Sequence, residues 1–102
     1  MSVLESRLDP GSATFQAQRE AMLALVAEIR DIESRIRAHS DKAAPKFEKR
    51  GQLLPRERVA RLLDRGAPFL ELSTLAGYKM HDDNGRNDVA GGGNIVGIGF
   101  VH

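Results

Sequence analysis

The clearest candidate chemistry in this sequence is the binding of an anion by basic side chains gathered between residues 46 and 65. Pro55 favours the first position of a helix, so Arg56 and Arg58 would lie in a first turn whose free N–H groups attract anions. The pattern predicts a phosphate-binding role for these two arginines. The alternative is a solvated surface with local ion pairs. The basic residues are Lys46, Lys49, Arg50, Arg56, Arg58, Arg61 and Arg65, and their acidic neighbours are Glu48, Glu57 and Asp64.

A second candidate is the glycine-rich stretch AGGGNIVGIGFVH, at residues 90–102. A dinucleotide-binding loop needs G-x-G-x-x-G, and counting from Gly91 places Val96 where the third glycine belongs. A P-loop needs a lysine after its last glycine, and here Ile98 follows Gly97. We therefore interpret the glycines as a turn that enters a β-strand.

Other reactive side chains form no convincing constellation. His81, Asp82 and Asp83 are adjacent, but one histidine beside two loop acids is more typical of solvated surface than of a metal site. No serine, histidine and acid occur in an order that indicates a nucleophile. We predict no catalytic residue and no metal ligand in this chain.

A long helix is predicted over residues 13–39, where apolar side chains recur at heptad spacing. The seam consists of Phe15, Met22, Leu25, Ile29, Ile32 and Ile36. Ser12 or Thr14 is a suitable N-terminal cap. Such a helix cannot bury its apolar stripe alone, so it needs a partner from this chain or from another. A helical dimerisation segment is one hypothesis that follows.

The second half of the chain predicts one short helix and two strands. A helix is expected over residues 55–66, with Gly66 at its C-terminal end. Strands are expected at 67–73 and 94–102, separated by a long polar loop, and the connection at 40–54 is polar and basic. A sheet of two strands is marginal by itself, so the sequence looks truncated.

Composition excludes several classes of protein. Fifteen basic and fourteen acidic residues leave a net charge of +1, which argues against bulk attraction to nucleic acid or to a membrane surface. There is no cysteine, so disulfide and thiolate chemistry are excluded. No apolar run approaches the roughly 20 residues of a bilayer span, and the N-terminus lacks the apolar segment of a secretory signal. A cytoplasmic protein is expected.

The stretch RGQLLPRERVARLLDRGAPFLELSTLAGY, together with GGGNIVGIGFVH, resembles the carboxyltransferase (β) subunits of biotin-dependent acyl-CoA carboxylases. The shared pattern runs arginine-glycine, then arginine-glutamate-arginine, leucine-leucine-aspartate, glycine, and phenylalanine-leucine-glutamate. It covers residues 46–102 closely and is most similar to the 3-methylcrotonyl-CoA and geranyl-CoA carboxylase branch. Two departures are Gln52, where lysine is usual, and Pro55, where many members have a threonine cap.

The resemblance implies an α/β fold, the N-terminal part of a crotonase-like carboxyltransferase domain. Residues 1–45 would be a helical arm, and residues 46–102 the start of the domain that binds acyl-CoA. The complete subunit would transfer a carboxyl group from carboxybiotin, carried by a biotin carboxylase and carrier (α) subunit, to the acyl-CoA, within a homo-oligomer of β subunits. The family's oxyanion turns map outside this chain, so the chain alone is expected to be inactive. The alternative is a free-standing module for CoA or phosphate binding, or for helical dimerisation.

Overall fold

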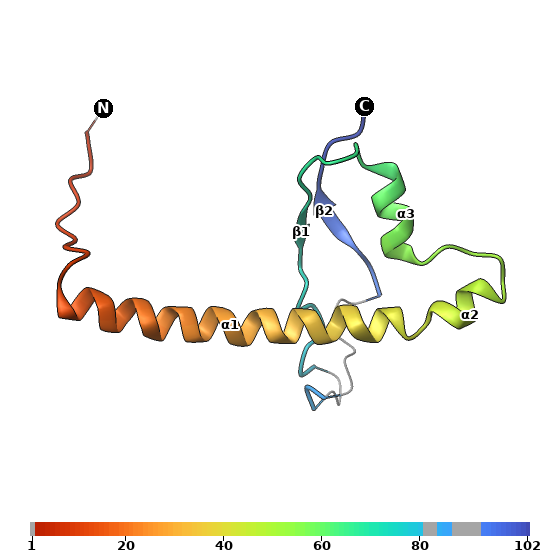
Figure 1. Ribbon diagram of the computed structural model, residues 1–102, viewed down its shortest axis with the longest axis horizontal. Coiled ribbons are helices and arrows are strands. Elements are labelled where there is room, and N and C mark those ends of the chain that lie inside the picture. The colour runs from red at the N-terminus through yellow and green to blue at the C-terminus, as the bar shows by residue number, and fades with distance from the viewer. Residues whose placement is uncertain (1, 81–83, 87–92) are drawn as a thin grey trace. The chain divides into compact units, whose positions relative to one another are not determined.

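A computed structural model describes residues 2–80, 84–86 and 93–102. Within these residues the order of elements is α1 (Ala13–Asp41), α2 (Ala44–Glu48), α3 (Pro55–Leu62), β1 (Leu70–Leu72) and β2 (Val96–Ile98), as shown in Figure 1. The prediction of an α/β chain with a long first helix is confirmed. Among the described residues, no helix is long and apolar enough to cross a membrane.

Helix α1 begins at a side-chain cap, because Ser12 Oγ accepts a hydrogen bond of 3.2 Å from the backbone N–H of Phe15. Gln16 Nε2 donates to the carbonyl of Pro10 at 2.7 Å and ties the preceding turn to the helix. Of the two predicted caps the structure uses Ser12, while Thr14 lies inside the helix. The helix ends at Asp41, two residues beyond the predicted end.

The chain divides into two compact units, Met1–Asp31 and Ile32–His102, so that α1 contributes to both. In the first unit the apolar seam is exposed, with Met22, Leu25 and Ile29 between 46% and 59% accessible. In the second unit Ile32 is 8% exposed and is the buried hydrophobic residue of the described chain. The predicted domain boundary at residue 45 concerns a larger subunit and stays a prediction.

The segment after α1 contains a helix that the sequence did not predict. Pro45 lies in the first turn of α2, where a missing N–H costs nothing, so the proline begins the helix instead of interrupting it. The helix has only five residues, too few for an apolar period to be visible. Gly51, with φ of +65°, follows in the turn that leads toward α3.

Helix α3 starts at Pro55 as predicted, and it also has a side-chain cap that was not predicted. Glu57 Oε2 accepts a hydrogen bond of 2.9 Å from the N–H of Leu54, which is half of a capping box. The helix ends at Leu62, and Leu63 is already extended. Gly66 adopts a positive φ of 78°, but it lies in the following turn and does not terminate the helix.

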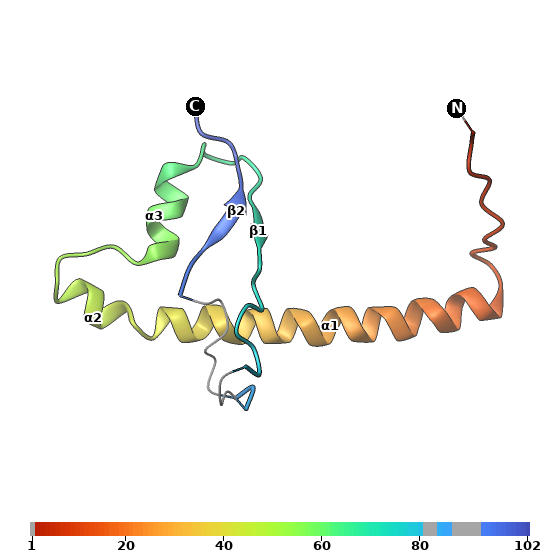
Figure 2. The ribbon, with the colours of Figure 1, turned by 180° about the vertical axis from the view of Figure 1, so that it is seen from behind.

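Strands β1 and β2 pair antiparallel, with Leu70 opposite Ile98 and Leu72 opposite Val96 (Figure 2). Gly97 lies under the ring of Phe69, and a Cβ at this glycine would also lie 2.7 Å from the carbonyl oxygen of Leu70. The observed strands are shorter than the predicted ranges, although both lie inside them.

Two hydrogen bonds join Asp64 to the chain that follows β2. The N–H of Asp64 donates to the carbonyl of Phe100 at 2.9 Å, and Asp64 Oδ1 accepts from the N–H of His102 at 2.8 Å. The residues after α3 are thereby held to the C-terminal residues.

The C-terminal part of α1 is joined to the segment after β1 within the second unit. Thr74 Oγ1 donates to Glu33 Oε1 at 2.8 Å, and Arg35 Nη1 donates to the carbonyl of Gly85 at 3.4 Å. His81, Asp82 and Asp83, weighed above as metal ligands, lie outside the described residues.

Candidate functional site

Arg56, one of the two predicted phosphate ligands, forms a bidentate ion pair with Glu71. Its Nη1 donates to Glu71 Oε2 at 2.9 Å, and its Nη2 donates to Oε1 at 2.8 Å. This is the planar, two-bond geometry in which guanidinium and carboxylate match best. The side chains are 30% and 13% exposed, so the pair is largely shielded from water. It connects the first turn of α3 to β1.

A second arginine approaches the same carboxylate from α1. Arg37 Nη2 lies 3.7 Å from Glu71 Oε2, and its side chain is 56% exposed. Glu71 thus forms ion pairs with both Arg56 and Arg37. The three side chains therefore link α1, α3 and β1 of the second unit through one carboxylate.

The hydrogen bond from Arg56 and the charges of both arginines hold the pKa of Glu71 below its ordinary value, against the opposing effect of burial. The same bond raises the pKa of Arg56, and the carboxylates of Glu71 and Asp41 add to this. Both groups are therefore charged at neutral pH. One donor of the guanidinium, Arg56 Nε, is buried without a hydrogen-bond partner in the described structure.

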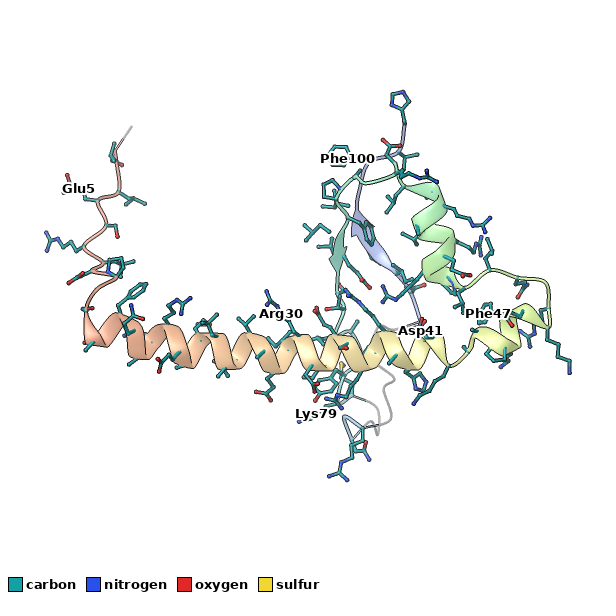
Figure 3. All side chains as sticks on the ribbon, in the orientation of Figure 1. Glu5, Arg30, Asp41, Phe47, Lys79 and Phe100 are labelled. Carbon is teal, nitrogen blue, oxygen red and sulfur yellow. The ribbon has the colours of Figure 1, made fainter. Side chains whose placement is uncertain are left out.

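Arg58, the other predicted ligand, has a different environment. Its side chain is exposed, and it borders a hollow of about 220 Å³ together with Phe47, Gln52, Leu53 and Pro55. Figure 3 shows Phe47 on α2. The hollow lies where the chain passes from α2 to α3, so an apolar surface adjoins an exposed cation.

The local pairing considered as the alternative for the basic cluster is not what the structure shows for Arg56. Glu57 is used to cap α3, and Asp64 binds the backbone of His102. The partner of Arg56 is Glu71, fifteen residues away. Alternation along β1 was the available signal, because it places Glu71 on the face opposite Leu70 and Leu72.

A larger cavity of about 290 Å³ adjoins Arg56 and is lined mainly by the end of α1, by α2 and by the approach to β2. His39, Ser40 and Asn94 are its other polar lining residues, and Ile36, Phe47 and Ile95 are among the apolar ones. In the part of the chain that the structure describes, no group of three metal-ligating side chains comes together.

The sequence and the fold of the chain were compared with those of known proteins. A solved structure of the β subunit of geranyl-CoA carboxylase from P. aeruginosa is 56% identical and superposes with a TM-score of 0.78, covering 97% of this chain and 18% of that one. The probable mitochondrial methylcrotonoyl-CoA carboxylase β chain of Drosophila melanogaster is 40% identical over 101 residues, 98% of this chain. No protein-family profile matches.

These findings confirm the resemblance seen in the sequence: the chain is a homologue of the β subunits of biotin-dependent acyl-CoA carboxylases. These two relatives are named as geranyl-CoA and methylcrotonoyl-CoA carboxylase subunits, and a Mycobacterium tuberculosis 3-methylcrotonyl-CoA carboxylase β1 subunit is 50% identical over 62 residues. The chain spans 17% of the length of the Drosophila relative. It therefore corresponds to one segment of such a subunit.

Proposed function

We propose that this chain is a segment of a carboxyltransferase subunit that moves a carboxyl group from carboxybiotin to an acyl-CoA of the 3-methylcrotonyl-CoA or geranyl-CoA type. The observation that carries the proposal is the 56% identity and TM-score of 0.78 to a geranyl-CoA carboxylase β subunit over 97% of the chain. A crotonase-like domain is the fold proposed for the whole subunit. Residues 1–45 are then a helical arm, and residues 46–102 begin the acyl-CoA-binding domain.

In this proposal the basic residues around Arg56 and Arg58 contribute to the binding of acyl-CoA, whose phosphate groups carry its negative charge. The support is the gathering of cations at this surface of the second unit, with Arg58 exposed beside an apolar hollow. No residue of the chain is assigned to biotin. The reacting groups are assigned to parts of the subunit outside this chain.

The proposed partners are a biotin-bearing α subunit and further β subunits. The exposed apolar seam of Met22, Leu25 and Ile29 supports an association through α1, because a stripe of this kind is stable only when it is covered. The proposed location is the cytoplasm. Relatives from fly, plant and slime mould are named as mitochondrial.

The test uses the gene product that contains this chain, purified with its biotin-bearing partner. ATP-dependent incorporation of labelled bicarbonate is measured with geranyl-CoA, 3-methylcrotonyl-CoA, propionyl-CoA and acetyl-CoA. The proposal expects carboxylation of one or both of the first two substrates, abolished by avidin. Activity with none of the four, from a biotinylated and assembled complex, would contradict it.

The intact mass of the protein from its native source separates this proposal from the alternatives. A mass several times 11.2 kDa is expected for a carboxyltransferase subunit. A mass near 11.2 kDa would exclude carboxyltransferase activity for this product. The CoA-binding and helical-dimerisation modules would then be tested by calorimetry with CoA and by sedimentation of Ile29→Asp.

A further inference from the structure

The two arginines in the first turn of α3 differ in how accessible their guanidinium groups are to a ligand. Both terminal nitrogens of Arg56 donate to the Glu71 carboxylate, and its side chain is 30% exposed. An anion that approached Arg56 would meet a charge already neutralised and would compete with a bidentate partner held in place by β1. Arg58, two residues later, has an exposed side chain.

The hollow beside Arg58 joins an apolar surface to this cation. Phe47 from α2, with Leu53 and Pro55, supplies apolar surface, and Gln52 supplies an amide that can donate and accept hydrogen bonds. An aromatic ring next to a guanidinium suits a ligand that combines a flat or apolar group with a phosphate.

The charges around the hollow favour an anion. Basic side chains exposed on and near α2 and α3 are Lys46, Lys49, Arg50, Arg58, Arg61 and Arg65. The acids of the same segment, residues 44–66, are Glu48, Glu57 and Asp64, and Glu71 of β1 is paired with arginine. The six cations therefore outnumber these three acids, and the surface attracts phosphate.

We infer that Arg58, at the hollow formed with Phe47, Gln52, Leu53 and Pro55, contacts a phosphate group of acyl-CoA, while Arg56 is a structural residue locked to Glu71. The inference rests on the proposed function and divides its basic cluster into two roles. Arg58 binds the ligand directly. Arg56 and Glu71 join α3 to β1 and do not touch the ligand.

The experiment uses the assembled holoenzyme with Arg58→Ala, Arg58→Lys and, as a matched control, Arg30→Ala, which removes an exposed arginine from the first unit. Each is assayed with acyl-CoA and with acyl-dephospho-CoA, which lacks only the 3′-phosphate. Arg58→Ala is expected to raise the KM for acyl-CoA about tenfold, the loss of one charge-assisted contact. Arg58→Lys is expected to retain part of the affinity, and the KM for ATP is expected to stay constant.

The two substrates identify the phosphate group. If Arg58 contacts the 3′-phosphate, Arg58→Ala leaves the KM for acyl-dephospho-CoA unchanged; if it contacts the diphosphate, the KM rises for both substrates. Either result supports the inference. A KM within twofold of the unmodified enzyme for both substrates, in an active and assembled enzyme, overturns the role of Arg58 and leaves the proposed function standing.

The structural role of Arg56 has its own readout. Arg56→Lys keeps the charge but loses the bidentate geometry, and it is expected to speed hydrogen exchange in α3 with the KM for acyl-CoA within twofold. A tenfold rise in KM at unchanged exchange would show Arg56 to be a ligand and overturn this half of the inference. The doubly reversed variant Arg56→Glu with Glu71→Arg is expected to recover protection lost in either single reversal.

Discussion

The guanidinium of Arg56 and the carboxylate of Glu71 meet through two parallel hydrogen bonds of 2.8 and 2.9 Å, joining the first turn of α3 to the middle of β1. Glu71 Oε2 also lies 3.7 Å from Nη2 of Arg37 of α1. A single acidic side chain, 13% exposed, thus pairs with two arginines from two helices. The loss of its charge should destabilise α1, α3 and β1.

Glu71→Gln keeps the shape of the side chain but removes the charge that holds Arg56. The expected cost is about 1–3 kcal/mol, because a partly buried guanidinium loses its charged acceptor. Hydrogen exchange of the amides in α3 and β1 measures the change as about 5- to 150-fold faster exchange. Glu48→Gln, an exposed acid on α2, is the control and should change exchange less than twofold. Equal effects of the two variants would contradict this role.

The same pair predicts how stability depends on pH. The pKa of Glu71 is lower in the folded chain than in the unfolded chain, so the unfolded chain binds more protons in acid. The stabilisation by Glu71 is therefore complete above its ordinary pKa and is lost as pH falls through the lower, folded pKa. Arg56 stays protonated throughout and adds no pH dependence in this range.

The measurement is hydrogen exchange in α3 at several pH values, corrected for the intrinsic rate. The difference between the unmodified protein and Glu71→Gln should be constant from pH 8 to pH 6 and should shrink in acid, where Glu71 becomes neutral like glutamine. A difference that grows toward low pH would contradict the assignment of the lowered pKa to Glu71.

Alanine substitutions at Gly97 and Gly99 are expected to destabilise the protein to different extents. A Cβ at Gly97 would overlap the ring of Phe69 and lie 2.7 Å from the backbone oxygen of Leu70, which cannot move without breaking the β1–β2 register. A Cβ at Gly99 would meet the end of the Leu63 side chain and the Phe69 ring, which can both rotate. Gly97→Ala should therefore cost about 1–3 kcal/mol and Gly99→Ala less.

Hydrogen exchange of the amides in β1 and β2 measures the loss of stability in each glycine variant. A larger loss of protection in Gly99→Ala than in Gly97→Ala would show that the approach of the Leu70 carbonyl oxygen to Gly97 is not the limiting contact.

The cap of α1 gives a prediction in the first unit. Ser12→Ala removes the acceptor for the N–H of Phe15 and should destabilise the first turn by about 0.5–2 kcal/mol. Thr14→Ala is the matched control, because Thr14 lies inside the helix, where alanine has the higher propensity. Exchange at Phe15 and Gln16 should become faster in Ser12→Ala and unchanged or slower in Thr14→Ala. The reverse order would assign the cap to Thr14.

Several elements were predictable because their signals are local. The heptad spacing between Phe15 and Ile36 defined α1 to within two residues at its C-terminal end, and Ser12 supplied its cap. Pro55 marked the start of α3. Each signal depends on neighbours within one or two helical turns, which the sequence displays directly.

Short elements and helix ends were predicted less well. Helix α2 has five residues, and Pro45 looked like a break because proline both starts and stops helices. Gly66 suggested a helix end four residues later than Leu62, because a glycine with positive φ serves a loop turn as well as a C-cap. In both places one residue type permits two backbone geometries, and the following residues decide between them.

By itself the sequence determined the long helix, the proline-started helix, the two apolar strands and the likeness to acyl-CoA carboxylase β subunits, because periodicity and motif spacing are properties of the chain. It gave Arg56 and Arg58 the same predicted role in phosphate binding. Only the tertiary structure separated them, because the pairing of β1 with β2 sets which face of β1 carries Glu71 and brings that carboxylate to Arg56 across fifteen residues. Ion pairs between distant residues depend on how strands and helices pack, and no local pattern encodes that distance.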